Sequence, residues 1–466
     1  MAGHKLPTAA DLTSPEPIEV LTKPFLRFAS LSSAGGLILI ACTVAAMLWA
    51  NSSASESYHH FFHGEKLSIG FAELELSKSL AHWINDALMA LFFFVVGLEI
   101  KREVLVGELS SPRKAALPIA AALGGMVVPA LIYVAFNAGE PSLRGWGVPM
   151  ATDIAFALGI LSLLGNRIPA SLKVFLVSLA IADDLGALIV IALFYTDELA
   201  TNYLLYAGGA TLAMVMLNVL RVRSPWIYFF FGLALWYFVF KSGVHATIAG
   251  VVGAMTIPAS ARVGAARYTA ATRDALEEFE SHNKDPDRNA LITREQHAAA
   301  WTIHTNSIQV MPVLHRLENA LHPYTVFLVI PIFALANAGI EIHGGLGQNL
   351  LNKPSFGVVL GLFVGKPLGI FLFSLVAVKL GIASLPRSVS WRHILGAGCL
   401  GGVGFTMALF IGNLAFAESP DDLTHTKLAV LVGSALSAIA GLVILATCRK
   451  QPDAPATPTT PATPAD

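Results

Sequence analysis

Repeated apolar runs of about twenty residues constrain this chain more than any other feature. A helix that crosses the hydrocarbon core of a bilayer needs about 20 mostly apolar residues, and such runs follow one another through most of the 466-residue sequence. Charged residues make up only 13% of the chain, which is about half the share of a typical soluble domain. The sequence therefore predicts an all-α, polytopic membrane protein.

Twelve of these runs match the length of a spanning helix. Placing the loops alternately on two sides puts 23 lysines and arginines on the side of both termini and six on the other, with Lys366 inside a span. Because cytoplasmic loops carry the excess of positive residues, we expect both termini in the cytoplasm. The predicted spans cover 33–51, 83–106, 115–137, 146–164, 171–195, 203–220, 225–241, 243–258, 323–340, 355–380, 391–415 and 425–447.

The segments outside the spans differ in composition. Residues 1–32 are polar, unlike a signal peptide, and are predicted to be a cytoplasmic tail. Residues 450–466 are rich in Pro, Thr and Ala and are predicted to be a disordered tail. Between them, 33–449 forms a twelve-helix domain, in which 259–321 is a long, polar cytoplasmic connection. The three cysteines suggest no disulfide framework.

The loop after the first span has the alternating pattern of a β-strand from Leu67 onward. We expect a small extracytoplasmic β-hairpin over 60–76. Its edge would be open to a second copy, so a homodimer contact is predicted there. His59, His60 and His63 resemble metal ligands but lack a completing Cys or carboxylate, so a solvated loop is favoured.

Two adjacent aspartates, Asp183 and Asp184, interrupt an otherwise aliphatic part of the span 171–195. A charged side chain at the bilayer centre costs about 2.5–3.5 kcal/mol or more. Carboxylate oxygens suit a small, hard cation, and two carboxylates in a low dielectric favour keeping a proton on at least one of them. The pair is therefore expected to hold either a cation or protons, and that competition is the basis of an exchange mechanism.

Spans 4 and 11 contain residues that break helices. Span 4 carries Pro149 and three glycines around Thr152 and Asp153, and span 11 has five glycines within 396–404. Because glycine inside a helix costs about 1 kcal/mol relative to alanine, both spans are expected to unwind. The resulting half-helices present ends with about half an elementary charge each, which Asp153 and Lys366 would compensate.

Other polar residues admit ordinary structural explanations. Glu99 and Glu103 share a helical face at the end of span 2, as in a helix end whose long side chains reach the interface. His245 is expected near the outer side, where a capping or packed histidine is more common than a proton relay. The stretch GKP at 365–367 has proline where a phosphate-binding loop requires Ser or Thr. We expect no nucleotide site, no cofactor, no nucleic-acid partner and no enzymatic activity.

Several longer motifs resemble the NhaA family of bacterial Na+/H+ antiporters over roughly residues 25–447. Because there are several of them and they occur in the same order along the chain, the probability of a chance similarity is very small. They are FVVGLEIKRE at 94–103, ATDIAFALG at 151–159, SLAIADDLG at 178–186, SGVHATIAG at 242–250, LENALHP at 317–323, FALANAG at 333–339 and GKPLG at 365–369.

The resemblance implies twelve spans, an inverted repeat relating spans 3–5 to spans 10–12, and two broken helices that cross at the midplane. It implies electrogenic, pH-regulated exchange of cytoplasmic Na+ or Li+ for external protons at a bacterial inner membrane, serving sodium and pH homeostasis. Asp183 and Asp184 would bind the cation and the protons. Thr152, Asp153 and Lys366 would balance the helix ends.

The resemblance also implies a cytoplasmic cluster that responds to pH. Position 319 is Asn where familiar members of the family carry His, which leaves the pH threshold of such a cluster open. With His245 added as a further candidate, the residues of this response would be Glu99, Arg102, Glu103, Glu318, His322 and His245.

Other classes of membrane protein compete with this interpretation. An intramembrane aspartyl protease places its two aspartates on separate helices within a Gly-x-Gly-Asp signature, which this chain lacks. A cation channel has no need of carboxylates that hold protons. A sodium-coupled solute symporter would need polar groups for an organic solute beside the ion site, and few are visible. Channel and symporter remain the alternatives.

Overall fold

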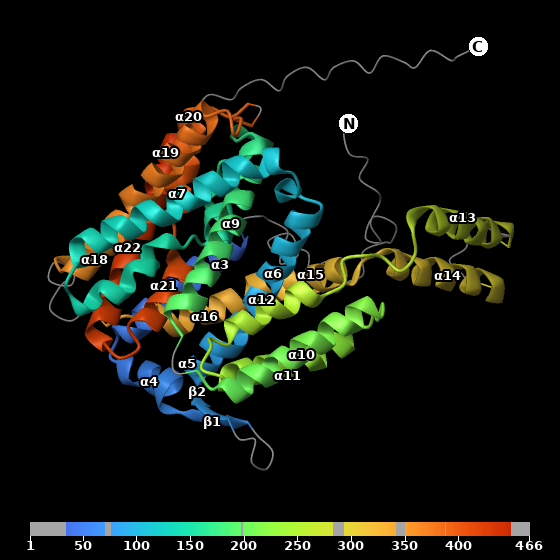
Figure 1. The fold of residues 1–466 in the computed structure, drawn as a ribbon, viewed down its shortest axis with the longest axis horizontal. Helices are drawn as coiled ribbons and strands as arrows, with labels where there is room; N and C mark the ends of the chain where they lie inside the picture. Colours follow the sequence, from blue (N-terminus) through green and yellow to red (C-terminus); the bar gives the residue numbers. More distant parts are fainter. Residues whose placement is uncertain are drawn as a thin grey trace.

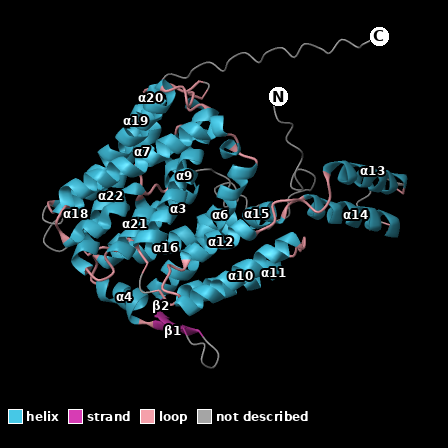
Figure 2. Ribbon diagram, viewed as in Figure 1, coloured by secondary structure: helices cyan, strands magenta, loops and turns pink. Residues whose placement is uncertain are grey.

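The computed structural model is a bundle of helices with one small two-stranded sheet (Figure 1) (Figure 2). The predicted tails, 1–32 and 450–466, lie outside the residues that the structure describes. The described residues are 34–69, 76–196, 199–282, 293–341, 350–386 and 388–448.

Within these residues, seven helices are long and apolar enough to cross a membrane, or nine spans if each of two bent pairs counts as one. The three remaining predicted spans hold shorter apolar helices, α3 (Ala34–Ala50), α11 (Pro225–Lys241) and α12 (Thr247–Thr256). The long helices are Leu80–Leu105, α7 (Pro112–Asn137), α9 (Ala170–Phe194), α10 (Thr201–Val219), Val313–Asn337, Lys353–Lys379 and α22 (Pro420–Ala446).

Three of the long helices contain a π-helical turn. Such a turn holds one residue more than an α-helical turn and is frequent at functional sites. One of them ends directly before Lys366. The successive parts are α5 (Leu80–Trp83), η2 (Ile84–Leu88) and α6 (Met89–Leu105); α15 (Val313–Tyr324), η6 (Thr325–Val329) and α16 (Ile330–Asn337); α18 (Lys353–Leu360), η7 (Gly361–Gly365) and α19 (Lys366–Lys379).

The two bent pairs occupy spans 4 and 11, where unwinding was predicted. In span 4 the 3-10 helix η4 (Pro141–Met150) meets α8 (Ile154–Leu163) at 44°, and in span 11 α20 (Trp391–Gly401) meets α21 (Phe405–Ala415) at 45°. The two breaks touch each other, because the amide of Asp153 donates to the carbonyl of Val403 over 2.7 Å. The predicted breaks in both spans are confirmed.

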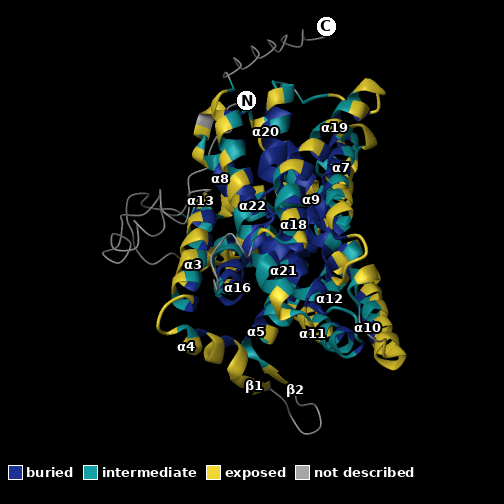
Figure 3. Ribbon diagram, turned by 90° about the vertical axis from the view of Figure 1, so that its left-hand side faces the viewer, coloured by how far each residue is buried: buried dark blue, intermediate teal, exposed yellow. Residues whose placement is uncertain are grey.

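Small residues bring the surrounding helices close. Gly124 of α7 and Gly369 of α19 face each other so tightly that a Cβ on either would overlap the other's carbonyl oxygen. On another side, α6 packs on α9 through buried Val96, Ile100 and Ile181. Figure 3 shows the buried residues gathered in the interior around α9, α18 and α21, with exposed residues towards the ends.

Two neighbouring boundaries differ from the prediction: the start of span 9 at 323 and the end of the preceding connection at 321. The helix begins at Val313, ten residues before the predicted 323, because its first turns are amphipathic and escape a search for apolar runs. The last part of the predicted 259–321 connection therefore belongs to this helix. The rest contains α13 (Ala265–Ser281) and α14 (Arg294–Val310), which pack on each other and extend away from the bundle (Figure 1).

The predicted hairpin differs from the structure at both ends. Strand β1 (Lys66–Ile69) pairs antiparallel with β2 (Leu76–Ser79), so the second strand continues beyond the predicted end at 76. At the start, the residues after α4 (Ser55–His59) form the π-helical turn η1 (His60–Gly64) instead of a strand. The residues 70–75 between the strands lie outside the described residues. Short 3-10 turns complete the described elements at η3 (Glu108–Ser110) and η5 (Gly165–Arg167).

Spans 7 and 8, which the sequence left almost fused, are separated by a sharp turn. Gly243 adopts a φ of +83°, a conformation that favours glycine. The helix of span 8 therefore starts only at Thr247, four residues after the predicted boundary.

Candidate functional site

Asp183 and Asp184 lie in the middle of α9, and each is only 1% exposed. One oxygen of Asp183, Oδ2, accepts hydrogen bonds from Lys366 Nζ over 2.6 Å and from Thr152 Oγ1 over 2.7 Å. The other oxygen of Asp183 and both oxygens of Asp184 have no hydrogen-bond partner among the described residues. Because buried polar atoms are nearly always paired, these three oxygens are available to a cation or to protons.

Lys366 is placed by the π-helical turn η7, which ends at Gly365. Its buried ammonium donates to Asp183 Oδ2 and also to the carbonyl oxygen of Met150, the last residue of η4. The sequence placed Lys366 near the ends of the half-helices but did not pair it with Asp183. In the structure the same ammonium group contacts the helix end at Met150 and the carboxylate of Asp183.

Thr152 and Asp153 occupy the unwound segment between η4 and α8. The hydroxyl of Thr152 lies 2.8 Å from the carbonyl oxygen of Gly401, the last residue of α20. Asp153 Oδ1 accepts from the amide of Phe156 over 2.9 Å and caps the start of α8. Its Oδ2 accepts from the amide and the hydroxyl of Thr406, in the first turn of α21. One carboxylate thus contacts the N-terminal ends of two half-helices.

The three aspartates at this site differ in how their negative charges are stabilised. Asp153 receives hydrogen bonds from two helix N-termini, which favour a negative charge. Asp183 is paired with the ammonium of Lys366. Asp184 has neither kind of support, and a buried charge without a partner is costly. The arrangement is chemically suited to take up a small cation or a proton at Asp184 and at the free oxygen of Asp183.

Five of the six candidates for a pH response come together between α6 and α15, in what we term the α6–α15 cluster. Arg102 lies at its centre, with Nη1 2.5 Å from Glu318 Oε1 and Nη2 3.1 Å from Glu103 Oε1. Beside it, His322 Nδ1 lies 3.4 Å from Glu99 Oε1. Residues far apart in the sequence thus form one group of charges.

The sixth candidate, His245, lies apart from this cluster. Its Nε2 is 3.6 Å from Asp86 Oδ1. Asp86 belongs to η2, thirteen residues before Glu99 in the same long helix. At about 1.5 Å per residue, His245 is about 20 Å from the α6–α15 cluster.

Other polar residues near these sites were missed from the sequence. Asn337 Nδ2 donates to Asn85 Oδ1 over 2.9 Å, and Asn413 Nδ2 donates to Asn337 Oδ1 over 2.7 Å. This chain of amides joins η2, α16 and α21. A polar residue inside an apolar run was the signal that identified the aspartates, and Asn85, Asp86, Asn337 and Asn413 carry the same signal.

The chain is similar to known proteins over most of its length. The chain matches the family described as Na+/H+ antiporter 1 over residues 26–445. It is 48% identical over 445 residues to the Na(+)/H(+) antiporter NhaA of Oleidesulfovibrio alaskensis, covering 96% of this chain and 97% of the relative. The NhaA of Helicobacter pylori is 46% identical over 420 residues, covering 90% of this chain and 94% of the relative. On this evidence the chain belongs to the NhaA family of Na+/H+ antiporters.

Proposed function

We propose that this chain exchanges Na+ or Li+ for protons across a membrane, with Asp183 and Asp184 as the groups that bind both. The observation that carries the proposal is the set of three buried carboxylate oxygens without a partner among the described residues. Hard oxygen ligands suit Na+ and Li+. The same oxygens can bind protons, so the two substrates compete for one site.

The exchange follows from charge balance in a buried site. A cation that enters adds a charge where charges are expensive, so its binding is favoured when protons leave the carboxylates. Two carboxylates can release more than one proton for each cation, which makes the exchange electrogenic. The ammonium of Lys366, 2.6 Å from Asp183 Oδ2, neutralises that carboxylate while the cation is absent.

We further infer that Thr152, Asp153 and Lys366 balance the ends of the broken helices. Lys366 and Thr152 contact the carbonyl ends of η4 and α20, and Asp153 contacts the amide ends of α8 and α21. These contacts place opposite charge at each helix end. Spans 4 and 11 would then be the mobile centre of an inverted repeat that relates spans 3–5 to spans 10–12.

The membrane arrangement of the proposal has twelve spans in a bacterial inner membrane and both termini in the cytoplasm. The excess of lysine and arginine on one side supports this orientation. Domain limits at 1–32, 33–449 and 450–466 belong to the same proposal. The α6–α15 cluster would lie on the cytoplasmic side and adjust activity to pH, with Glu99, Arg102, Glu103, Glu318 and His322 as its members and His245 acting separately.

We also propose a homodimer formed through the strands of the 60–76 region. A two-stranded sheet has open edges that can pair with a second copy, and β1–β2 is such a sheet. Deletion of 60–76 should convert the dimer to a monomer on native gels. A dimer that survives the deletion would place the contact elsewhere.

The decisive experiment uses everted vesicles with a preformed pH gradient. Addition of Na+ or Li+ should dissipate part of that gradient, because cations would be exchanged for protons. The alternatives predict different results: a channel would pass Na+ without moving protons, and a symporter would require an organic solute. If neither cation changes the gradient at any pH from mildly acidic to alkaline, the exchange proposal is wrong.

A further inference from the structure

A half-buried carboxylate, Asp86, lies at the end of the long helix opposite to the α6–α15 cluster. It belongs to the π-helical turn η2, and its side chain is 16% exposed. Among the described residues its carboxylate accepts no hydrogen bond, and the ring of His245 lies beside it, with Nε2 3.6 Å from Oδ1. A carboxylate in a span without a close partner is costly, which indicates a role.

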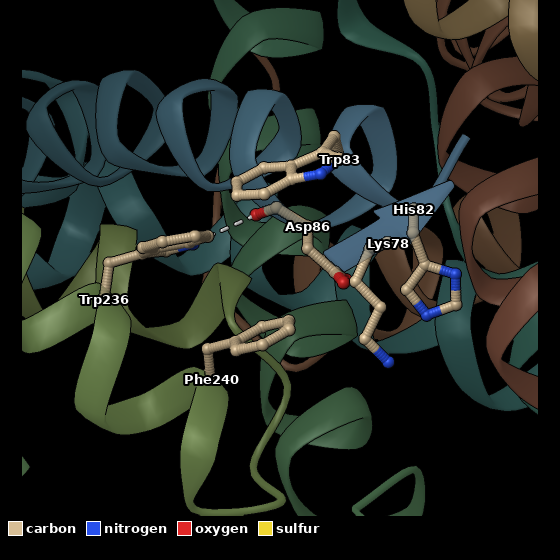
Figure 4. A pocket seen from close by; sticks show the side chains of 6 residues that line it. All are labelled: Lys78, His82, Trp83, Asp86, Trp236 and Phe240. Carbon is tan, nitrogen blue, oxygen red and sulfur yellow. Dashed lines mark hydrogen bonds between the residues drawn. The ribbon is translucent and has the colours of Figure 1, made fainter. Parts of the chain in front are cut away.

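The surroundings of Asp86 form a small pocket (Figure 4). Its walls are aromatic and are formed by Trp83, Trp236 and Phe240. Trp236 Nε1 donates a hydrogen bond to the backbone oxygen of Asp86 over 3.3 Å. In Figure 4 the carboxylate points away from Trp236 towards Lys78 and His82. Because Lys78 lies on β2, the pocket is next to the strand-bearing end of the molecule. Its cavity volume of about 10 Å³ is close to the minimum that holds one water molecule.

The hydrogen bonds of His245 determine which of its ring nitrogens carries the proton. Its Nδ1 lies 2.8 Å from Thr247 Oγ1 and accepts from the amide of Thr247 over 3.5 Å. The neutral ring therefore carries its proton on Nε2, which is the nitrogen that faces Asp86 Oδ1. At 3.6 Å the two atoms are too far apart for a direct hydrogen bond, and a water molecule can bridge them.

His245 also contacts the half-helix that begins at the ion site. Its ring packs edge-on against Phe410 of α21, with centroids 5.1 Å apart. Asp153 holds the first turn of the same α21 through Thr406. His245 thus links Asp86 to the half-helix whose first turn contacts Asp153.

We propose that Asp86 is a proton-transfer group that passes protons between solvent at the strand-bearing end and the site at Asp183 and Asp184. This inference rests on the proposed exchange function. A proton from water binds a carboxylate oxygen of Asp86 to give the neutral acid, and the same proton then leaves to a water on the inner side, which restores the carboxylate. The groups facing Asp86 are Lys78, His82 and His245, whose positive or hydrogen-donating character favours a carboxylate but disfavours a resident Na+.

The test separates proton movement from sodium movement in purified protein reconstituted into vesicles. Exchange of radioactive Na+ for unlabelled Na+ moves no net proton, whereas Na+/H+ exchange does. Asp86→Asn should slow Na+/H+ exchange about tenfold or more, as expected for loss of a positioned acid–base group. Na+/Na+ exchange and its KM for Na+ should stay unchanged, and Asp86→Glu should retain both activities.

Two further variants make the result decisive. Glu65→Gln, an exposed acid near the same strands, should leave both modes unchanged. His245→Ala keeps the Asp86 carboxyl and should slow only Na+/H+ exchange, by about threefold, so it serves if Asp86→Asn does not fold. Equal slowing of both modes, or no slowing of either, would overturn the role of Asp86. Failure of the unmodified protein to exchange Na+ for protons would instead refute the proposed function.

Discussion

The central aspartate site and the α6–α15 cluster contain the same kinds of residue in very different surroundings. Each has carboxylates beside a basic side chain, Lys366 in the centre and Arg102 in the cluster. In the centre, the side chains of Asp183 and Lys366 are both 1% exposed. In the cluster, Arg102 is 33% exposed and its partner Glu318 is 7% exposed. The chemistry is shared, but only one of the two sites is isolated from solvent.

This difference in exposure fits the two proposed roles: exchange of a cation for protons at the central site, and adjustment of that exchange to pH at the cluster. Away from water, a change of charge is expensive, so a cation can replace a proton only when the total charge is nearly preserved. Near water, solvent and salt screen the charges, so a change of charge at one group is less expensive. The buried contact of Val96, Ile100 and Ile181 packs α6, which carries part of the cluster, against α9, which carries Asp183 and Asp184.

The largest expected effect is at the central pair. Asp183→Asn and Asp184→Asn each replace a carboxylate of the proposed ion site by a neutral amide. A lost charge-assisted contact costs about 2–3 kcal/mol, and tenfold in affinity corresponds to about 1.4 kcal/mol, so exchange should fall about a hundredfold in everted vesicles. Asp274→Asn on exposed α13 is the matched control and should be unchanged. Near-normal exchange in both central variants would move the site elsewhere.

A different effect, on stability, is expected when the buried pair is broken from its other side. Lys366→Ala leaves Asp183 without its cation, and breaking a buried ion pair costs about 3–5 kcal/mol. The temperature of unfolding should fall clearly, whereas Lys379→Ala, exposed at the end of the same helix, should change it little. Transport measured on the same sample distinguishes the roles of Lys366: retained exchange indicates compensation of helix ends, and lost exchange without loss of stability indicates that Lys366 carries a proton.

The smallest effect is expected in the α6–α15 cluster. Glu318→Gln removes one negative charge beside Arg102 and His322, so neighbouring groups should lose their protons at lower pH. Because partly exposed ion pairs contribute about 1 kcal/mol or less, and one pH unit corresponds to about 1.4 kcal/mol, the half-maximal pH of exchange should fall by less than about one unit. The maximal rate should stay within about twofold of the unmodified protein, as it should for Glu280→Gln on α13. A large fall in maximal rate would remove the distinction between the two sites.

Much of the helical framework could be predicted from the sequence, because bilayer thickness imposes a length on each apolar run. Helix-breaking residues, Pro149 and the glycines of 396–404, located both bent pairs for an equally local reason. The start of span 9 at Val313 was missed, since amphipathic turns resemble a polar connection.

Pairings between distant residues could not be predicted in the same way. The bond between Lys366 and Asp183 depends on how α9 and α19 pack and on a π-helical turn that no periodicity of apolar residues marks. The amide chain through Asn337 likewise requires three elements to meet. The resemblance indicated which residues matter, but their contacts come from tertiary packing.

The π-helical turn Gly361–Gly365 gives the helix around it a shifted phase. One additional residue rotates every later side chain by about 100° relative to a continuous α-helix. The side chains of α19 are therefore rotated relative to those of α18. This rotation directs Lys366 towards Asp183. A continuous α-helix of the same residues would present the ammonium to a different neighbour.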